Sequence, residues 1–201
     1  MAKVVLSNIK RVKAVVPIRS TSPMIQHKWS EKAKQMMRDK QQKGTKTKAR
    51  DKRDPESEAI EATYVNDDGD VGLPAMAFKS AIITAAHKDI GIEKTLVRKA
   101  LFLRCNDANM VVAFDEASEP VVREDMVRVG AGSADLRWRP EFREWSCEIT
   151  VILDADNLPI EHLINLVNRA GFGVGLCEMR PEKGKDFGRF EVDTTKTVTG
   201  G

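Results

Sequence analysis

The sequence predicts an α+β fold in which helices cover one face of an antiparallel sheet. Residues 145–153 alternate between apolar and polar side chains, which is typical of a half-buried strand. Apolar residues at 160–167 follow directly at helical spacing. Along the 201 residues, the expected order is strand, helix, strands with short helices, strands, a strong strand, a strong helix and a strand.

The N-terminal part predicts a strand followed by a helix. Residues 3–18 end in an apolar–polar alternation with a period of two, which indicates a strand. Thr21, Ser22 and Pro23 are typical of a helix start, with Ser22 as the cap. We expect this helix to run from about Met24 to Gln41.

Residues 42–57 have no apolar period and predict a basic, flexible insertion, because they offer nothing to bury. The alternative is a solvated linker without a partner. Residues 61–65 then predict a short strand. The acidic turn at 66–70 predicts the tip of a hairpin, since its spacing does not fit a calcium loop.

The middle of the chain predicts helices and short strands. Leu73-Pro74 opens a helix whose apolar face carries side chains at i, i+3, i+4 and i+7, namely Phe78, Ala81, Ile82 and Ala85. A short helix is expected at 92–99. Strands are expected at 100–104, 110–114 and 121–129.

The C-terminal part contains the strand and the helix with the clearest apolar patterns. The strand at 145–153 precedes a helix that begins near Pro159 and ends at Gly171. A strand at 190–192 completes the sheet, and 194–201 forms a polar tail. A single ferredoxin-like (RRM-like) domain over 1–201, with insertions, is the most economical arrangement. The open sheet face of such a domain is a common platform for single-stranded RNA.

Basic residues are concentrated in one segment. Between Lys28 and Arg53 there are eleven basic and three acidic residues, a net charge of +8, which leaves −5 for the rest of a chain whose total is +3. A basic arm on a mildly acidic body indicates a polyanionic partner. The contacts expected from this segment are Lys28, Lys32, Lys46, Lys48, Arg50, Lys52 and Arg53.

Other classes of protein are disfavoured. The three cysteines are far apart and include no CxxC pair, so we expect reduced thiols in the cytoplasm and neither a zinc site nor a disulfide framework. No apolar run is long enough for a membrane span, and no signal-peptide core is present. No spacing of carboxylates, histidines or cysteines predicts a metal, and no cofactor is expected.

Residues 171–190 predict part of a nucleic-acid groove. This stretch holds five glycines, two lysines, two arginines and three phenylalanines. Glycine amides can form an anion-binding concavity, cations favour phosphate and phenylalanine can stack on a base. The expected contacts are Gly171, Phe172, Gly173, Gly175, Arg180, Lys183 and Lys185. The alternative is a helix-capping glycine followed by an ordinary surface loop.

Two segments resemble the RAMP superfamily, the ferredoxin-like proteins of CRISPR effector complexes. Residues 73–81 (LPAMAFKSA) are similar to its proline-led helix start, although Ser80 stands where the superfamily often has glycine. The glycine-rich loop after a helix is similar in kind, with a different glycine spacing. In the patterns at 168–173 and 180–184 the chain also resembles certain phage-encoded proteins.

The resemblance implies a backbone subunit that polymerises along a guide RNA in a bacterial or phage-infected cell. It implies that Lys79 faces RNA and that Gly171, Gly173, Gly175 and Gly184 shape the loop. The partners would be RNA or another single-stranded nucleic acid, together with further copies of the chain or other ribonucleoprotein subunits.

Aromatic residues and histidines add candidates. Trp138 lies between Arg137 and Arg139, a combination that suits stacking on a base, whereas Trp145 is expected in the core. His27 beside Lys28 is the candidate general base of a metal-independent endoribonuclease, with packing near a helix start as its alternative. The leading hypothesis is a non-enzymatic, self-associating RNA-binding protein. An endoribonuclease and a phage structural or host-inhibitory protein remain as alternatives.

Overall fold

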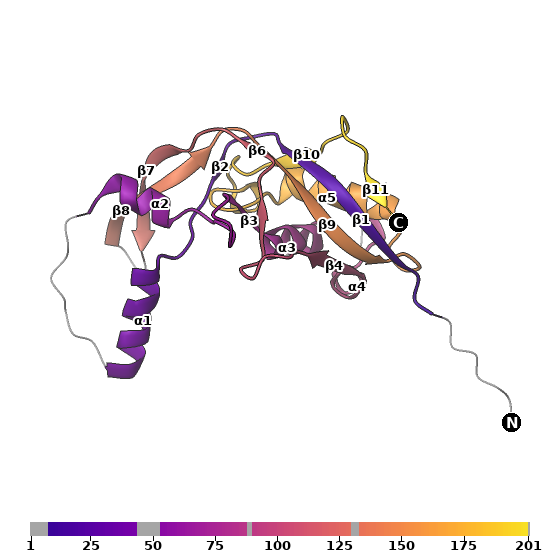
Figure 1. Cartoon of the computed structure of the whole chain (residues 1–201), viewed down its shortest axis with the longest axis horizontal. Helices are drawn as coiled ribbons and strands as arrows, with labels where there is room; N and C mark the ends of the chain where they lie inside the picture. Colours follow the sequence, from indigo (N-terminus) through magenta and orange to yellow (C-terminus); the bar gives the residue numbers. More distant parts are fainter. Residues whose placement is uncertain (1–7, 44–52, 88–89, 130–132, 201) are drawn as a thin grey trace, which may run out of the picture.

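A computed structural model describes residues 8–43, 53–87, 90–129 and 133–200 (Figure 1). Its main sheet has the strand order β10-β1-β9-β4, with β11 beside β1 and β6 beside β9. Every pairing within this sheet is antiparallel. The strands are β1 (Arg11–Ser20), β4 (Leu101–Arg104), β6 (Glu116–Ala117), β9 (Trp145–Asp154), β10 (Phe190–Val192) and β11 (Thr199–Gly200).

Three helices cover one face of the main sheet: α3 (Ala75–Ala85), α4 (Lys94–Ala100) and α5 (Ile160–Gly173) (Figure 1). The inward side chains of β1 and β9, such as Val16 and Ile149, are fully buried with Phe78 of α3 and Leu166 of α5 in one core. Trp145 is buried there too, as predicted. Helices on one side of an antiparallel sheet confirm the predicted α+β class.

A second, three-stranded sheet has the order β2-β8-β7 and extends beyond one end of the main sheet (Figure 1). Its strands are β2 (Met24–Ile25), β7 (Val121–Val129) and β8 (Ser133–Phe142), and α2 (Pro55–Glu61) packs against β8. We call β2, β7, β8 and α2 the hairpin lobe. Only residues 21–23 separate β1 from β2, and only 143–144 separate β8 from β9, so the lobe continues strands of the main sheet.

The predicted helix at 24–41 is wrong at its start. Met24 and Ile25 are fully buried and form β2, opposite Phe142 and Glu141 of β8. Helix α1 begins only at Glu31 and extends to Lys43. Two adjacent apolar residues after Pro23 gain more from burial in the lobe than from helix formation, a tertiary effect that local propensity does not capture.

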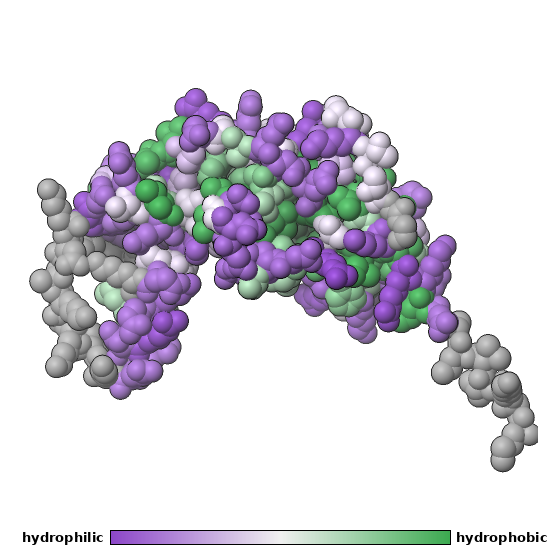
Figure 2. Space-filling view, in the orientation of Figure 1, coloured by the Kyte–Doolittle hydropathy of each residue, from purple (hydrophilic) through white to green (hydrophobic). Residues whose placement is uncertain are grey.

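The described ends of the insertion predicted at 42–57 belong largely to helices. Its first residues end α1, and residues 44–52 lie outside the described part of the chain. Helix α2 begins at Pro55, where the carboxylate of Asp54 accepts hydrogen bonds from the Ser57 amide at 3.4 Å and its hydroxyl at 2.6 Å. Figure 2 shows α1, which projects from the molecule, as hydrophilic over its visible face.

The remaining local predictions are largely confirmed. The tip at 66–70 is a turn, closed by a bridge between Val65 and Val71. The strand predicted at 61–65 is reduced to this one bridge residue. Strand β5 (Val111–Ala113) pairs with β3 (Gly72–Pro74), which was not predicted. The tail is not wholly irregular, because β11 joins the edge of β1. Within the described residues, no helix has the length and apolar character that crossing a membrane requires.

Candidate nucleic-acid interface

The glycine-rich loop begins later than predicted, because Gly171 does not end α5. The helix continues to Gly173, and Val174 is its C-cap. A Cβ at position 171 would lie 1.7 Å from the carbonyl oxygen of Phe190. Gly171 therefore allows α5 to approach β10 closely, while a Cβ at Gly173 would meet no atom within 4 Å.

The loop after α5 folds back on β2. The amide of Gly188 donates to the carbonyl of Pro23 at 2.7 Å, and that of Glu178 donates to Ile25 at 3.1 Å. Gly175 and Gly184 adopt left-handed φ values of 71° and 72°, which suit glycine. Their amides donate to the carbonyls of Ala170 and Pro181, both at 2.8 Å. The predicted concavity of free glycine amides is therefore not formed by Gly175, Gly184 and Gly188.

Of the loop side chains predicted to contact nucleic acid, Arg180 is hydrogen-bonded within the protein, whereas the others are exposed. The guanidinium of Arg180 donates to the Glu182 carboxylate at 2.8 Å and to the carbonyl of Cys177 at 3.0 Å. Lys183 and Lys185 are exposed, and Phe172 is 77% exposed at the end of α5. The two lysines and Phe172 remain accessible to a ligand.

Arg139 is a buried structural residue, although the sequence suggested a nucleic-acid contact. It is 2% exposed, and its Nη2 donates to Asp125 Oδ2 at 2.7 Å. Its Nη1 lies 3.5 Å from Glu178, so the ion pair links the β7–β8 hairpin to the glycine-rich loop. Arg123 bonds the same Asp125 at 2.9 Å, and its Cζ lies 4.9 Å from the Phe187 ring centroid. A buried charge this closely paired is unavailable to phosphate.

Arg53 and Trp138 meet on the hairpin lobe. The Arg53 Cζ lies 4.8 Å from the Trp138 ring centroid, a cation–π contact. Arg53 also donates to Asp135 at 2.9 Å and to Glu58 at 2.5 Å. The hydrogen bond with Glu58 is the main reason why the pKa of Arg53 is raised. Trp138 Nε1 donates to Glu124 at 2.8 Å, so the ring is fixed at the lobe surface.

His27 lies between a carboxylate and a guanidinium. Its Nδ1 is 3.4 Å from Glu178 Oε1, and its Nε2 is 3.4 Å from Nη1 of Arg137. The hydrogen bond with His27 is the first cause that lowers the pKa of Glu178, followed by the charges of His27 and Arg139, against an opposing effect of burial. Arg137 thus lies near His27, while Arg139 beside it is buried.

The remaining predicted contacts lie apart or outside the described residues. Lys28 follows β2, and its amide donates to the carbonyl of Ala62 at 2.8 Å. Lys79 of α3 lies at the β4 edge of the main sheet, 4.6 Å from the Phe102 ring centroid. The side chain of Lys32 and the residues Lys46, Lys48, Arg50 and Lys52 lie outside the described part of the chain.

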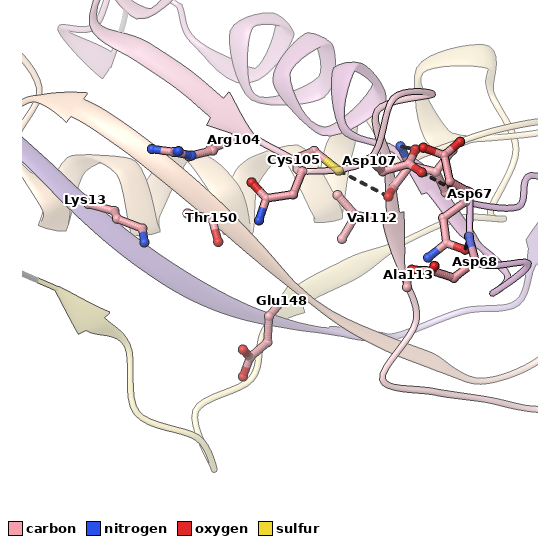
Figure 3. A pocket seen from close by; sticks show the side chains of 13 residues that line it. Lys13, Asp67, Asp68, Arg104, Cys105, Asp107, Val112, Ala113, Glu148 and Thr150 are labelled. Atoms are coloured by element: carbon pink, nitrogen blue, oxygen red, sulfur yellow. Dashed lines mark hydrogen bonds between the residues drawn. The ribbon is translucent and has the colours of Figure 1, made fainter.

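The structure adds a surface that the sequence did not indicate. On the face of the main sheet opposite the helices, a hollow of about 510 Å³ lies beside β1, β9 and β4 (Figure 3). Lys13, Thr150 and Arg104 line it from these strands, while Asp67 and Asp107 line it from two turns. The strand alternation could have shown that Lys13 and Arg104 face away from the core, but not that they share a hollow.

The described residues include no group of three or more histidine, cysteine or acidic side chains that could hold a metal ion. In comparisons with known proteins, no protein-family model and no curated protein matches this chain.

Proposed function

We propose that the protein binds single-stranded nucleic acid, with RNA as the favoured partner, as a backbone-like subunit that associates with further copies along the strand. The observation that carries this proposal is the meeting of three distant segments on the hairpin lobe. Arg53 ends the basic segment and contacts Trp138, and the glycine-rich loop reaches the same lobe through Glu178 and Phe187. The end of the +8 segment therefore lies beside an aromatic ring, on the lobe that the glycine-rich loop contacts.

The architecture supports a ferredoxin-like interpretation. Strands β1 and β4 are joined through α3 and α4, strands β9 and β10 are joined through α5, and the order β10-β1-β9-β4 interleaves the two pairs. This is the pattern of a split β-α-β unit repeated twice. The hairpin lobe is then a pair of insertions, one after β1 and one before β9. The fold alone does not establish function, so the proposal depends on the lobe and its charge.

A charge substitution tests the proposal. The variant with Lys46, Lys48, Arg50 and Lys52 replaced by Gln is expected to bind labelled single-stranded RNA more weakly than wild type, equally for all sequences. The slope of log K against log salt should fall by about 0.7 for each lost phosphate contact. Fluorescence anisotropy between low and moderate salt measures both quantities.

The matched control replaces four exposed cations in the helical layer, Lys94, Arg98, Lys99 and Arg169, by Gln. Both variants lose the same charge, so only a local contact distinguishes them. If both variants bind RNA equally weakly, the loss comes from net charge and not from a contact at 46–52. If wild type binds no RNA at any salt concentration, the proposed function is refuted.

A second candidate function, metal-independent endoribonuclease, gains support from the pairing of His27 with Glu178. A carboxylate on one imidazole nitrogen can orient the ring so that the other nitrogen faces a substrate. Arg137 lies 3.4 Å from the other imidazole nitrogen, and Lys28 is the next residue in the chain, so these two cations are the candidates to steady a phosphate. Labelled RNA should then be cleaved by wild type and at least about a hundredfold more slowly by His27→Ala. Intact RNA after incubation with wild type would remove this candidate.

A further inference from the structure

The face of the main sheet opposite the helices carries cations and an exposed ring in adjacent rows. Lys13 and Phe102 both lie opposite Ile152 of β9, and Val15 and Arg104 both lie opposite Thr150. Leu101 and Leu103 lie opposite Leu153 and Val151, whose side chains face the core. Phe102 and Arg104 therefore face outward.

Phe102 is held in place but remains accessible. Its ring is 53% exposed, and the Lys79 Nζ lies 4.6 Å from its centroid. The ammonium lies over the ring in a cation–π contact.

Lys13 and Arg104 carry charges that are not neutralised within the described residues. Both side chains are exposed, and neither makes an ion pair or hydrogen bond with the described part of the chain. They contrast with Arg53, Arg139 and Arg180, each of which is bonded to a carboxylate. Free cations are the ones that can neutralise phosphate.

The hollow has a charge gradient along its length (Figure 3). Asp67 accepts from the Ala108 amide at 2.8 Å, and Asp107 accepts from the Val111 amide at 2.8 Å, so these carboxylates fix the two turns at one end. Hydrogen bonds to its carboxylate hold the pKa of Asp107 low, so it stays ionised. Asp68 and Glu148 line the hollow as well, so a polyanion is repelled from most of it and attracted only to the end that carries Lys13 and Arg104.

We infer that this outer sheet face is a binding site for one nucleotide of a single strand, with a base stacked on Phe102 and the neighbouring phosphates on Lys13 and Arg104. The inference rests on the proposed function and places a contact outside the hairpin lobe. Side chains two residues apart on a strand are separated by about 7 Å, and adjacent strands by about 4.8 Å. Because β9 lies between β1 and β4, Lys13 is about 10 Å from Phe102 across the sheet, and Arg104 is about 7 Å from Phe102 along β4, distances that the flanking phosphates of one nucleoside and two long cationic side chains can span. Lys79 acts as a positioning residue for the ring.

Binding of a labelled oligouridine to the full chain tests the inference. Phe102→Leu is expected to raise the Kd about tenfold, in the range for loss of one stacked base, while Phe102→Tyr retains near wild-type affinity. Lys13→Gln with Arg104→Gln is expected to raise the Kd and reduce the salt slope by about 1.4. Lys99→Gln with Arg169→Gln, on the helical layer, is the control of equal charge and should leave the salt slope unchanged.

Ultraviolet cross-linking followed by peptide mass spectrometry gives an independent result. We expect a cross-link within the peptide that contains Phe102, and its loss in Phe102→Leu. If wild type binds but Phe102→Leu and the Lys13/Arg104 variant bind equally well, the outer face is not the site and the proposed function survives. If wild type binds no single strand, both the function and this site are refuted. Circular dichroism of each variant shows whether a loss of affinity comes from misfolding.

Discussion

Replacing Gly171 by Ala is expected to destabilise the protein severely. The new Cβ would lie 1.7 Å from the carbonyl oxygen and 2.5 Å from the carbonyl carbon of Phe190, which are backbone atoms that cannot rotate away. Helix α5 and strand β10 must separate, which disturbs the packing of Phe190 against Phe78. Overpacking costs about 1–3 kcal/mol and occasionally more, and this contact should reach the upper end. Chemical denaturation monitored by circular dichroism measures the loss.

Gly173→Ala is the control, two residues further along the same helix. A Cβ at this position meets no atom within 4 Å. Alanine is favoured over glycine in a helix by up to about 1 kcal/mol, so this variant should be as stable as wild type or slightly more stable. Similar losses in the two variants would show that close packing of α5 on β10 is not what requires glycine.

Arg139→Met is expected to cost about 1–3 kcal/mol of unfolding free energy, because it removes a charge-assisted hydrogen bond to the buried Asp125 carboxylate, which keeps Arg123 as its remaining partner. Arg139 and Asp125 have side chains that are 3% and 8% exposed, and they are 2.7 Å apart. The substitution also removes the link to Glu178 of the glycine-rich loop. Urea denaturation gives the free energy, and limited proteolysis shows whether the hairpin lobe loosens first.

Arg19→Met removes a similar ion pair at the surface of the main sheet. Arg19 and Glu191 lie 2.6 Å apart with side chains 49% and 40% exposed. Surface pairs of this kind contribute about 0–1 kcal/mol, so this variant should be nearly as stable as wild type. If the two arginine variants lose the same free energy, burial of the Arg139–Asp125 pair has no special role in stability.

The sequence predicted those elements whose pattern depends on one face of burial. Strands β1 and β9 and helices α3 and α5 follow local periodicity, and the structure confirms them; β7 and β10 were also predicted, although not from a periodic apolar face. The start of α1 was wrong because the role of Met24 and Ile25 is set by β8, more than one hundred residues away in sequence. Which strands pair is a non-local property that spacing does not encode.

For the candidate site, composition pointed to certain segments but not to the burial and bonding of each side chain in them. Arg139 and Lys183 were both predicted to contact nucleic acid because they are cations in candidate segments. In the structure, Arg139 is buried with Asp125 and Lys183 is exposed. The glycines of the loop were expected to offer free amides, but Gly175, Gly184 and Gly188 use theirs for internal hydrogen bonds. Burial and partners decide whether a cation can reach a ligand, and both depend on the folded chain.

The short connections between the two sheets bear on how the molecule responds to force. The connections at 21–23 and 143–144 are too short to act as flexible linkers. Each joins a strand of one sheet directly to a strand of the other. A load applied at the outer end of β7 and β8 would therefore be transmitted along the backbone into β1 and β9, so the lobe would act as a stiff lever.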